Sequence, residues 1–372
     1  MRRRTILGVT LLATAFGVAA LAPPAKSQAP PKKGNPAEDI SFESADGVKL
    51  SARFWKGASG KSSTILLLPA VNKDPTKGGW DDLGSELSGA GYNVMRLEWR
   101  GHGKSTDITP NMFWAGTPYI SGLNKQFVKG ADKTPIKNDL FAKDFKTGYY
   151  PVLVNDIMAA RTELEKRHDR GELNLSSLYL IGAGDATPLG FLYITAEWKR
   201  EAQRPEAIRG APTWVTANRN ISTNTDPAAK DIAGCIWLSP MKNPQIKDET
   251  IKRWASTYAP DMRDETKMLF LTGADDSAGT AAAKFFFQNV LVAKPTIKSL
   301  KPLQQTFNRD IKKTRLTGAE LLGNDEKFGV ETTIKKFLED VEKERKNRTT
   351  QNRLYEKPLP IDIASFGITF GN

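Results

Sequence analysis

The chain has 372 residues, of which 39% are hydrophobic, and this is enough apolar material for one large domain or two modest ones. It has a single cysteine, Cys235, and two histidines, His102 and His168, which excludes an internal disulfide and a cysteine metal cluster and leaves few candidates for a histidine-based site. The formal net charge is +12, but the basic residues are spread along the chain without a stripe of interleaved aromatic residues, so we expect a solvated basic surface and no nucleic-acid partner.

The N-terminal residues 1–27 have the form of a signal peptide. Three arginines at positions 2–4 precede an apolar stretch over 6–21, and Ala25-Lys26-Ser27 is a suitable cleavage site. We therefore expect an exported protein, periplasmic or extracellular, with no transmembrane helix after the leader is removed. An uncleaved leader would instead serve as a membrane anchor. Residues 28–38 are rich in proline and lysine and are expected to form a flexible linker.

The expected domain spans residues 39–346 and alternates strands with helices. Strands are expected at 40–44, 48–55, 64–68, 92–97, 178–181, 232–238, 268–272 and within 303–316, and helices at 82–90, 150–170, 281–292 and 333–346. Residues 106–148 and 197–229 lack clear periodicity and are expected to be lid-like insertions, and residues 347–372 are expected to form a C-terminal tail. This order predicts an α/β fold with a mostly parallel central sheet flanked by helices.

Residues 178–190 have the pattern of a buried strand, a tight turn and a helix. Thr187 and Pro188 are typical of an N-cap followed by a proline in the first helical turn. The same arrangement of strand, turn and helix carries the nucleophile elbow, G-x-S-x-G, of one large class of hydrolases. Small residues occupy both outer positions of that motif here, but Gly184 stands where the serine would be.

The pattern as a whole resembles the α/β-hydrolase superfamily, in particular its lysophospholipase-like and serine-aminopeptidase-like branch, over residues 40–341. Four features carry the resemblance, in the order that the superfamily has them. They are the opening hairpin at 44–50, the R-G-H-G-K-S turn at 100–105, the elbow at 182–186 and the acid-bearing turn at 273–276. The resemblance implies an α/β-hydrolase fold, but a fold alone does not establish an activity.

The residues that the resemblance implies for catalysis are incomplete. A triad needs a nucleophile, a base and a group that orients the base. Gly184 has no nucleophile, and the acid would be Asp276 or its neighbour Asp275. The base would be a histidine after the acid strand, but residues 277–372 contain none. Glu320 lies in the loop that should carry it, and an ordinary carboxylate is a poor base for an alcohol.

The resemblance also places a binding site around the elbow, formed by Ala70, Val71, Gly184 and Asp185. The backbone N–H groups of Val71 and Asp185 would form an oxyanion hole, although the charge of the Asp185 side chain would disfavour an oxyanion there. This position suits a small acyl or peptide-like ligand. We expect neither a metal nor a cofactor.

Two interpretations of Asp185 stay open. A register shifted by one residue would make it an aspartate nucleophile, similar to haloalkane dehalogenases and epoxide hydrolases, with His102 as the available base. Alternatively, Asp185 stabilises the start of a helix through its charge and hydrogen bonding. Nucleotide-binding motifs are not favoured, because the glycines at 182–184 lack the third glycine of a dinucleotide fingerprint and 101–105 lacks the first half of a P-loop.

The sequence therefore predicts an exported α/β-hydrolase-fold protein without the standard Ser-His-Asp triad. The main hypothesis is a non-catalytic homologue that binds a small acyl or peptide-like ligand or a cell-envelope protein. The alternative is an active hydrolase of ester-like bonds that uses Asp185 with His102. A scaffold in the cell envelope that uses the basic surface is a third hypothesis.

Overall fold

A computed structural model describes most of the chain beyond the linker. The described residues are 36–58, 62–71, 73–116, 118–132, 137–202, 228–291, 306–311, 314–348, 350, 352–353 and 357–369. The chain divides into two units, residues 1–31 and 32–372, and all described residues belong to the second. The expected signal peptide, residues 28–35 of the expected linker and residues 203–227 of the second insertion lie outside the described residues.

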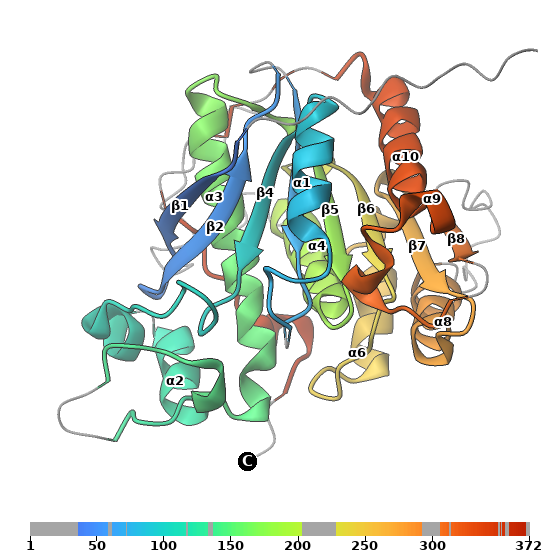
Figure 1. Cartoon of the computed structure of the whole chain (residues 1–372). Coiled ribbons are helices and arrows are strands. Elements are labelled where there is room, and N and C mark those ends of the chain that lie inside the picture. The colour runs from blue at the N-terminus through green and yellow to red at the C-terminus, as the bar shows by residue number, and fades with distance from the viewer. Residues whose placement is uncertain are drawn as a thin grey trace, which may run out of the picture. The chain divides into compact units, whose positions relative to one another are not determined.

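An eight-stranded sheet organises this unit, in the order β1-β2-β4-β3-β5-β6-β7-β8 (Figure 1). The strands are β1 (Glu38–Glu43), β2 (Lys49–Trp55), β3 (Ser63–Leu68), β4 (Asn93–Glu98), β5 (Asn174–Ala183), β6 (Ile232–Leu238), β7 (Lys267–Gly273) and β8 (Thr306–Ile311). Strand β2 runs antiparallel to β1 and β4, whereas each pairing from β4 to β8 is parallel. The expected fold class is confirmed: the chain has the α/β-hydrolase fold.

Helices cover both faces of the sheet. The helices are α1 (Trp80–Gly89), α2 (Pro118–Phe127), α3 (Val154–Asp169), α4 (Ala186–Ala202), α6 (Asp248–Arg253), α7 (Met262–Glu265), α8 (Ser277–Lys284), α9 (Asp325–Phe328) and α10 (Val330–Arg345). Helices α1 and α10 bury their apolar residues in one core cluster with one face of the sheet, and α3, α4 and α8 share the other cluster (Figure 1). Because both faces are covered, the central strands contain continuous apolar runs, such as 65–68 in β3 and 235–238 in β6.

Three segments differ in detail from the expected pattern. The first insertion contains a helix, α2, which the sequence did not indicate. Helix α4 begins at Ala186, so Thr187 is already helical and is not the N-cap. Residues 357–369, within the expected tail, pack on the domain: Ile361, Ile363 and Phe366 are buried.

Two glycines let α4 and β5 approach β6 closely. A Cβ atom on Gly182 would lie 2.7 Å from the Trp237 ring, and one on Gly190 would lie 2.2 Å from it. Trp237 is fully buried and its ring centroid lies 5.5 Å from that of Phe191 on α4. The close packing of β5 and α4 against β6 therefore holds the elbow turn in place. This turn lies in the middle of the sheet, at the carboxyl ends of the parallel strands.

Candidate functional site

The turn after β5 has the backbone geometry of an elbow. Gly184 adopts a left-handed conformation, φ +54°, which glycine reaches without strain. Its N–H donates to the carbonyl of Leu238 at 3.0 Å, and its own carbonyl accepts from the N–H groups of Met241 and Thr187 at 3.0 and 3.2 Å. These bonds fix the turn against the segment that follows β6.

The position of the missing side chain is closely bordered by two apolar groups. A Cβ atom on Gly184 would lie 3.3 Å from the Cβ of Ala70 and 3.7 Å from the Sδ of Met241. Both neighbours are apolar, and the Met241 side chain is among the most exposed large hydrophobic ones in the described chain. Apolar atoms thus border Gly184, and one of them belongs to a flexible methionine side chain.

Asp185 turns its carboxylate inward. The side chain is 7% exposed, and its Oδ1 accepts the backbone N–H of Val71 at 2.7 Å. The carbonyl of Asp185 accepts a hydrogen bond from the buried Tyr150 hydroxyl. Burial and the negative charge of Asp185 raise the pKa of Tyr150 well above its ordinary value, so Tyr150 remains a neutral donor. One of the two amides expected for an oxyanion hole, that of Val71, therefore already binds a carboxylate.

Asp276 and Glu320 each cap a helical turn. Asp276 precedes α8, and its Oδ1 accepts the N–H of Gly279 at 2.9 Å. The Oε2 of Glu320 accepts the N–H and the hydroxyl of Thr317 at 3.3 and 3.2 Å. Both carboxylates thus have local hydrogen bonds of the kind that stabilise the first turn of a helix.

The loop expected to carry a catalytic histidine lies near the elbow. A Cβ atom on Gly318 would be 3.5 Å from the Cβ of Ala183, the last residue of β5. Gly318 has a positive φ of 53°. The loop therefore presents a residue without a side chain toward the end of β5.

His102 lies in the turn after β4. Its Nδ1 is 3.2 Å from the carbonyl oxygen of Arg100 in the same turn, and its side chain is half-buried. The structure thus brings Ala70, Val71, Gly184 and Asp185 together, whereas the resolved hydrogen bonds of the His102 and Asp276 side chains lie within their own turns.

Arg100, the first residue of the R-G-H-G-K-S motif, belongs to a buried cluster of charged side chains. Arg100 is fully buried and forms ion pairs with Asp46 at 2.8 Å and with Asp156 at 2.6 Å. Burial works to raise the pKa of Asp46, but the charge of Arg100 outweighs it and lowers that pKa. This cluster joins the β1–β2 hairpin, the turn after β4 and helix α3, so the motif here supports the fold.

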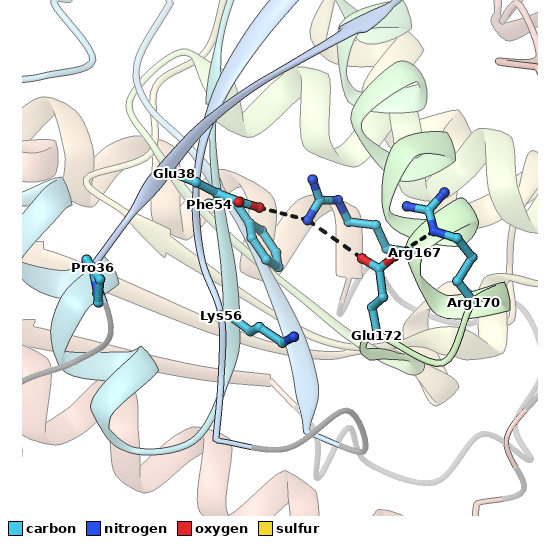
Figure 2. A pocket seen from close by; sticks show the side chains of 7 residues that line it. All are labelled: Pro36, Glu38, Phe54, Lys56, Arg167, Arg170 and Glu172. Atoms are coloured by element: carbon cyan, nitrogen blue, oxygen red, sulfur yellow. Dashed lines mark hydrogen bonds and ion pairs between the residues drawn. The ribbon is translucent and has the colours of Figure 1, made fainter.

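A separate cavity of about 370 Å³ is lined by residues of β1, β2, the end of α3 and their adjoining turns (Figure 2). Its lining residues are Pro36, Glu38, Phe54, Lys56, Arg167, Arg170 and Glu172. Arg167 stacks over Phe54 at 4.6 Å and pairs with Glu38 at 2.9 Å, and Arg170 pairs with Glu172 at 2.6 Å. The arginines already have carboxylate partners in it, and we do not include this cavity in the candidate site.

Among the described residues, no group of three or more histidine, cysteine, aspartate or glutamate side chains is placed to hold a metal ion. Cys235 is buried in β6, and burial raises the pKa of its thiol. No helix in the described part of the chain is both long and apolar enough to cross a membrane.

Sequence reasoning missed Ser239, the residue that follows β6. It is the non-glycine residue with a positive φ, 40°, in the described chain, and its buried hydroxyl has no hydrogen-bond partner there. A backbone in this region is costly for serine. The Ser-Pro pair after an apolar strand indicates a sharp turn, but not its handedness.

No protein-family profile matches the chain, and no curated protein sequence matches it. Among solved structures, it is similar to an esterase from Pyrococcus furiosus, with 14% identity and a TM-score of 0.45 over 82% of this chain and 91% of the other. It is also similar to dipeptidyl peptidase 4 from Porphyromonas gingivalis, with 13% identity and a TM-score of 0.40 over 83% of this chain and 36% of the other. A third similar structure, DcsB in complex with a substrate analogue, has 11% identity and a TM-score of 0.43 over 82% and 99%.

Proposed function

We propose that this chain is a non-catalytic α/β-hydrolase-fold protein that binds a small acyl or peptide-like ligand, or a partner protein, at the elbow. The observation that carries the proposal is the hydrogen bond from the Val71 amide to the Asp185 carboxylate, 2.7 Å long, directly beside Gly184. Acyl transfer needs that amide to bind a developing oxyanion, and a fixed carboxylate both occupies the donor and repels the negative charge.

The neighbouring groups support the same proposal. A glycine at 184 removes the nucleophile, while the elbow backbone and its hydrogen bonds remain. Glu320 lies in the loop where the superfamily carries its catalytic histidine, and its carboxylate accepts a hydrogen bond from Thr317 in the same turn. The atoms nearest to the missing side chain, the Cβ of Ala70 and the Sδ of Met241, are apolar, which favours an acyl chain or an apolar peptide side chain as the ligand.

Turnover of nitrophenyl esters tests the absence of catalysis. We expect no rate above background for the wild-type chain or for Gly184→Ser, because the variant still lacks a base and a free Val71 amide. Asp264→Ala is the matched control, because Asp264 is an exposed aspartate on α7 and is not among the candidate site residues. Turnover that is lost in Asp185→Ala and in His102→Gln, but kept in Asp264→Ala, would establish the alternative hydrolase and refute the proposal.

Thermal unfolding with added ligands tests the binding. Short-chain fatty acids and short apolar peptides are the probes, and a ligand that binds only the folded chain raises the unfolding temperature with its concentration. Ala70→Leu should abolish that shift because it fills the space beside Gly184. An equal shift in wild type and Ala70→Leu would place binding elsewhere.

We further propose that the chain is exported and that its relatives are lysophospholipase-like or serine-aminopeptidase-like proteins. The export proposal rests on residues 1–27 and the relationship on the motifs at 100–105 and 182–186. Mass spectrometry of the protein from its native cells tests the export proposal. A mature N-terminus near Gln28 supports it, and an intact leader in a soluble cytoplasmic fraction contradicts it.

A further inference from the structure

Two short segments of the first insertion pair through their backbones, and three exposed lysines lie on or beside them. Residues 127–129 and 144–146 lie side by side: Lys129 N–H donates to the Asp144 carbonyl at 2.9 Å, and Lys146 N–H donates to the Phe127 carbonyl at 2.8 Å. Phe127 is buried, whereas Lys129, Lys143 and Lys146 are exposed. The backbone pairing therefore fixes where these three side chains leave the surface.

An aromatic ring is exposed among these lysines. Phe141 is 38% exposed, and the Nζ of Lys143 lies 5.3 Å from the centre of its ring. We call Phe141, Lys129, Lys143 and Lys146 the Phe141 patch. The Lys129 Nζ donates to the carbonyl of Lys143 at 3.2 Å, which places these two ammonium groups on the same part of the surface.

The positive charges of the Phe141 patch are not compensated. The nearby carboxylates of Asp139 and Asp144 are both bound to Lys137. In the part of the chain that the structure describes, no carboxylate lies within ion-pair distance of the patch lysines. The Nζ of Lys146, for example, donates to the Gln126 carbonyl at 2.8 Å.

We propose that the Phe141 patch binds the surface of an anionic lipid bilayer. The lysines are attracted to the negative headgroups, and the exposed ring enters the apolar boundary beneath them. A purely ionic partner would use the lysines but leave the ring in water, so the combination favours a bilayer over a soluble polyanion. The net charge of +8 that remains without residues 1–27 adds long-range attraction to such a surface.

Co-sedimentation with vesicles tests this inference. The chain beginning at Gln28 is used, because the leader could bind lipid by itself and because the compact unit from Lys32 onward contains the whole sheet. We expect binding to phosphatidylcholine vesicles that contain phosphatidylglycerol, little binding to pure phosphatidylcholine, and steep weakening with salt. Lys129→Gln with Lys143→Gln should weaken partitioning roughly 25-fold, about fivefold for each lysine.

Matched variants distinguish membrane binding by the Phe141 patch from binding that depends only on the net charge of the chain. Phe141→Ser should weaken partitioning roughly fivefold through lost apolar burial. The double variant Lys336→Gln with Lys343→Gln on α10 should change it far less than Lys129→Gln with Lys143→Gln does. Equal loss in the α10 variant, no loss in Phe141→Ser, equal binding to neutral vesicles, or binding to heparin without binding to vesicles would each overturn the proposal.

Discussion

Replacing Asp185 by alanine should lower the stability of the fold by a measurable amount. The change leaves the N–H of Val71, a residue only 5% exposed, without its acceptor. An unsatisfied buried donor costs about 1–3 kcal/mol. Loss of a negative charge at the start of α4 costs a further ~0.3–1 kcal/mol. We therefore expect Asp185→Ala to lower the free energy of unfolding by roughly 1.3–4 kcal/mol.

Urea unfolding measures this loss as a lower midpoint at an unchanged slope. Asp185→Asn keeps an oxygen acceptor for Val71 and should lose only about 0.5–1.5 kcal/mol. Asp275→Ala removes an exposed aspartate and should stay within about 0.5 kcal/mol of wild type. If Asp185→Ala unfolds at the same urea concentration as Asp275→Ala, the carboxylate does not hold the Val71 amide, and the main support for the proposed function is lost.

Three further changes test the structure at the elbow and at the start of α10. Gly190→Ala should destabilise the fold by about 1–3 kcal/mol in thermal or urea unfolding, because the new Cβ would lie 2.2 Å from Trp237; an unchanged midpoint would contradict this packing. Ser239→Gly should raise the free energy of unfolding by about 1 kcal/mol, since glycine relieves the positive φ and removes the unpaired hydroxyl; a loss of stability would show that the hydroxyl has a partner. Burial raises the pKa of the Glu331 carboxyl from 4.5 to about 7, so its protonated form stabilises the fold at low pH, and this stabilisation is lost as the pH rises through about 7. Glu331→Gln should therefore flatten that part of the pH dependence of the urea midpoint. If the pH profile of the variant is unchanged, another group causes this pH dependence.

The central sheet could be predicted from the sequence because its strands are buried on both faces. The apolar runs at 64–68, 232–238 and 268–272 correspond to β3, β6 and β7, whose neighbours are parallel on both sides. The Asp46-Gly47 pair correctly indicated the hairpin between β1 and β2, in which Glu43 pairs with Lys49. Strand periodicity and turn chemistry are local signals, and here they agree with the fold.

Helix α2 was missed because its start resembles a break in the chain. Gly116 and Pro118 indicate a loop, yet proline is favourable in the first turn of a helix. Gly122 inside the helix weakens the pattern further. Its deeply buried positions include Asn124, which donates to Asp46 at 3.1 Å, so an apolar stripe alone could not reveal the helix.

The packing of the C-terminal segment had no local signal at all. The carbonyls of Phe366 and Ser365 accept hydrogen bonds from Trp254 at 3.0 Å and from Lys199 at 2.7 Å, residues that lie more than a hundred positions earlier. Side chains hold this irregular segment through its backbone, so neither helical nor strand periodicity is required. Such contacts depend on the tertiary fold and could not be predicted from the segment itself.

The site shows the same division between local and remote information. The sequence correctly indicated that Gly184 lies in the turn after β5. The hydrogen-bond partner of the Asp185 carboxylate, however, is the N–H of Val71, which lies 114 residues earlier in the chain. A serine at 184 would need a free amide opposite it, and a carboxylate bound to that amide would oppose the reaction. Without a nucleophile, no oxyanion develops, and the Asp185 carboxylate can satisfy a buried donor and favour the positive end of α4. Gly184 and Asp185 are therefore compatible with each other in a way that Asp185 and a catalytic serine are not.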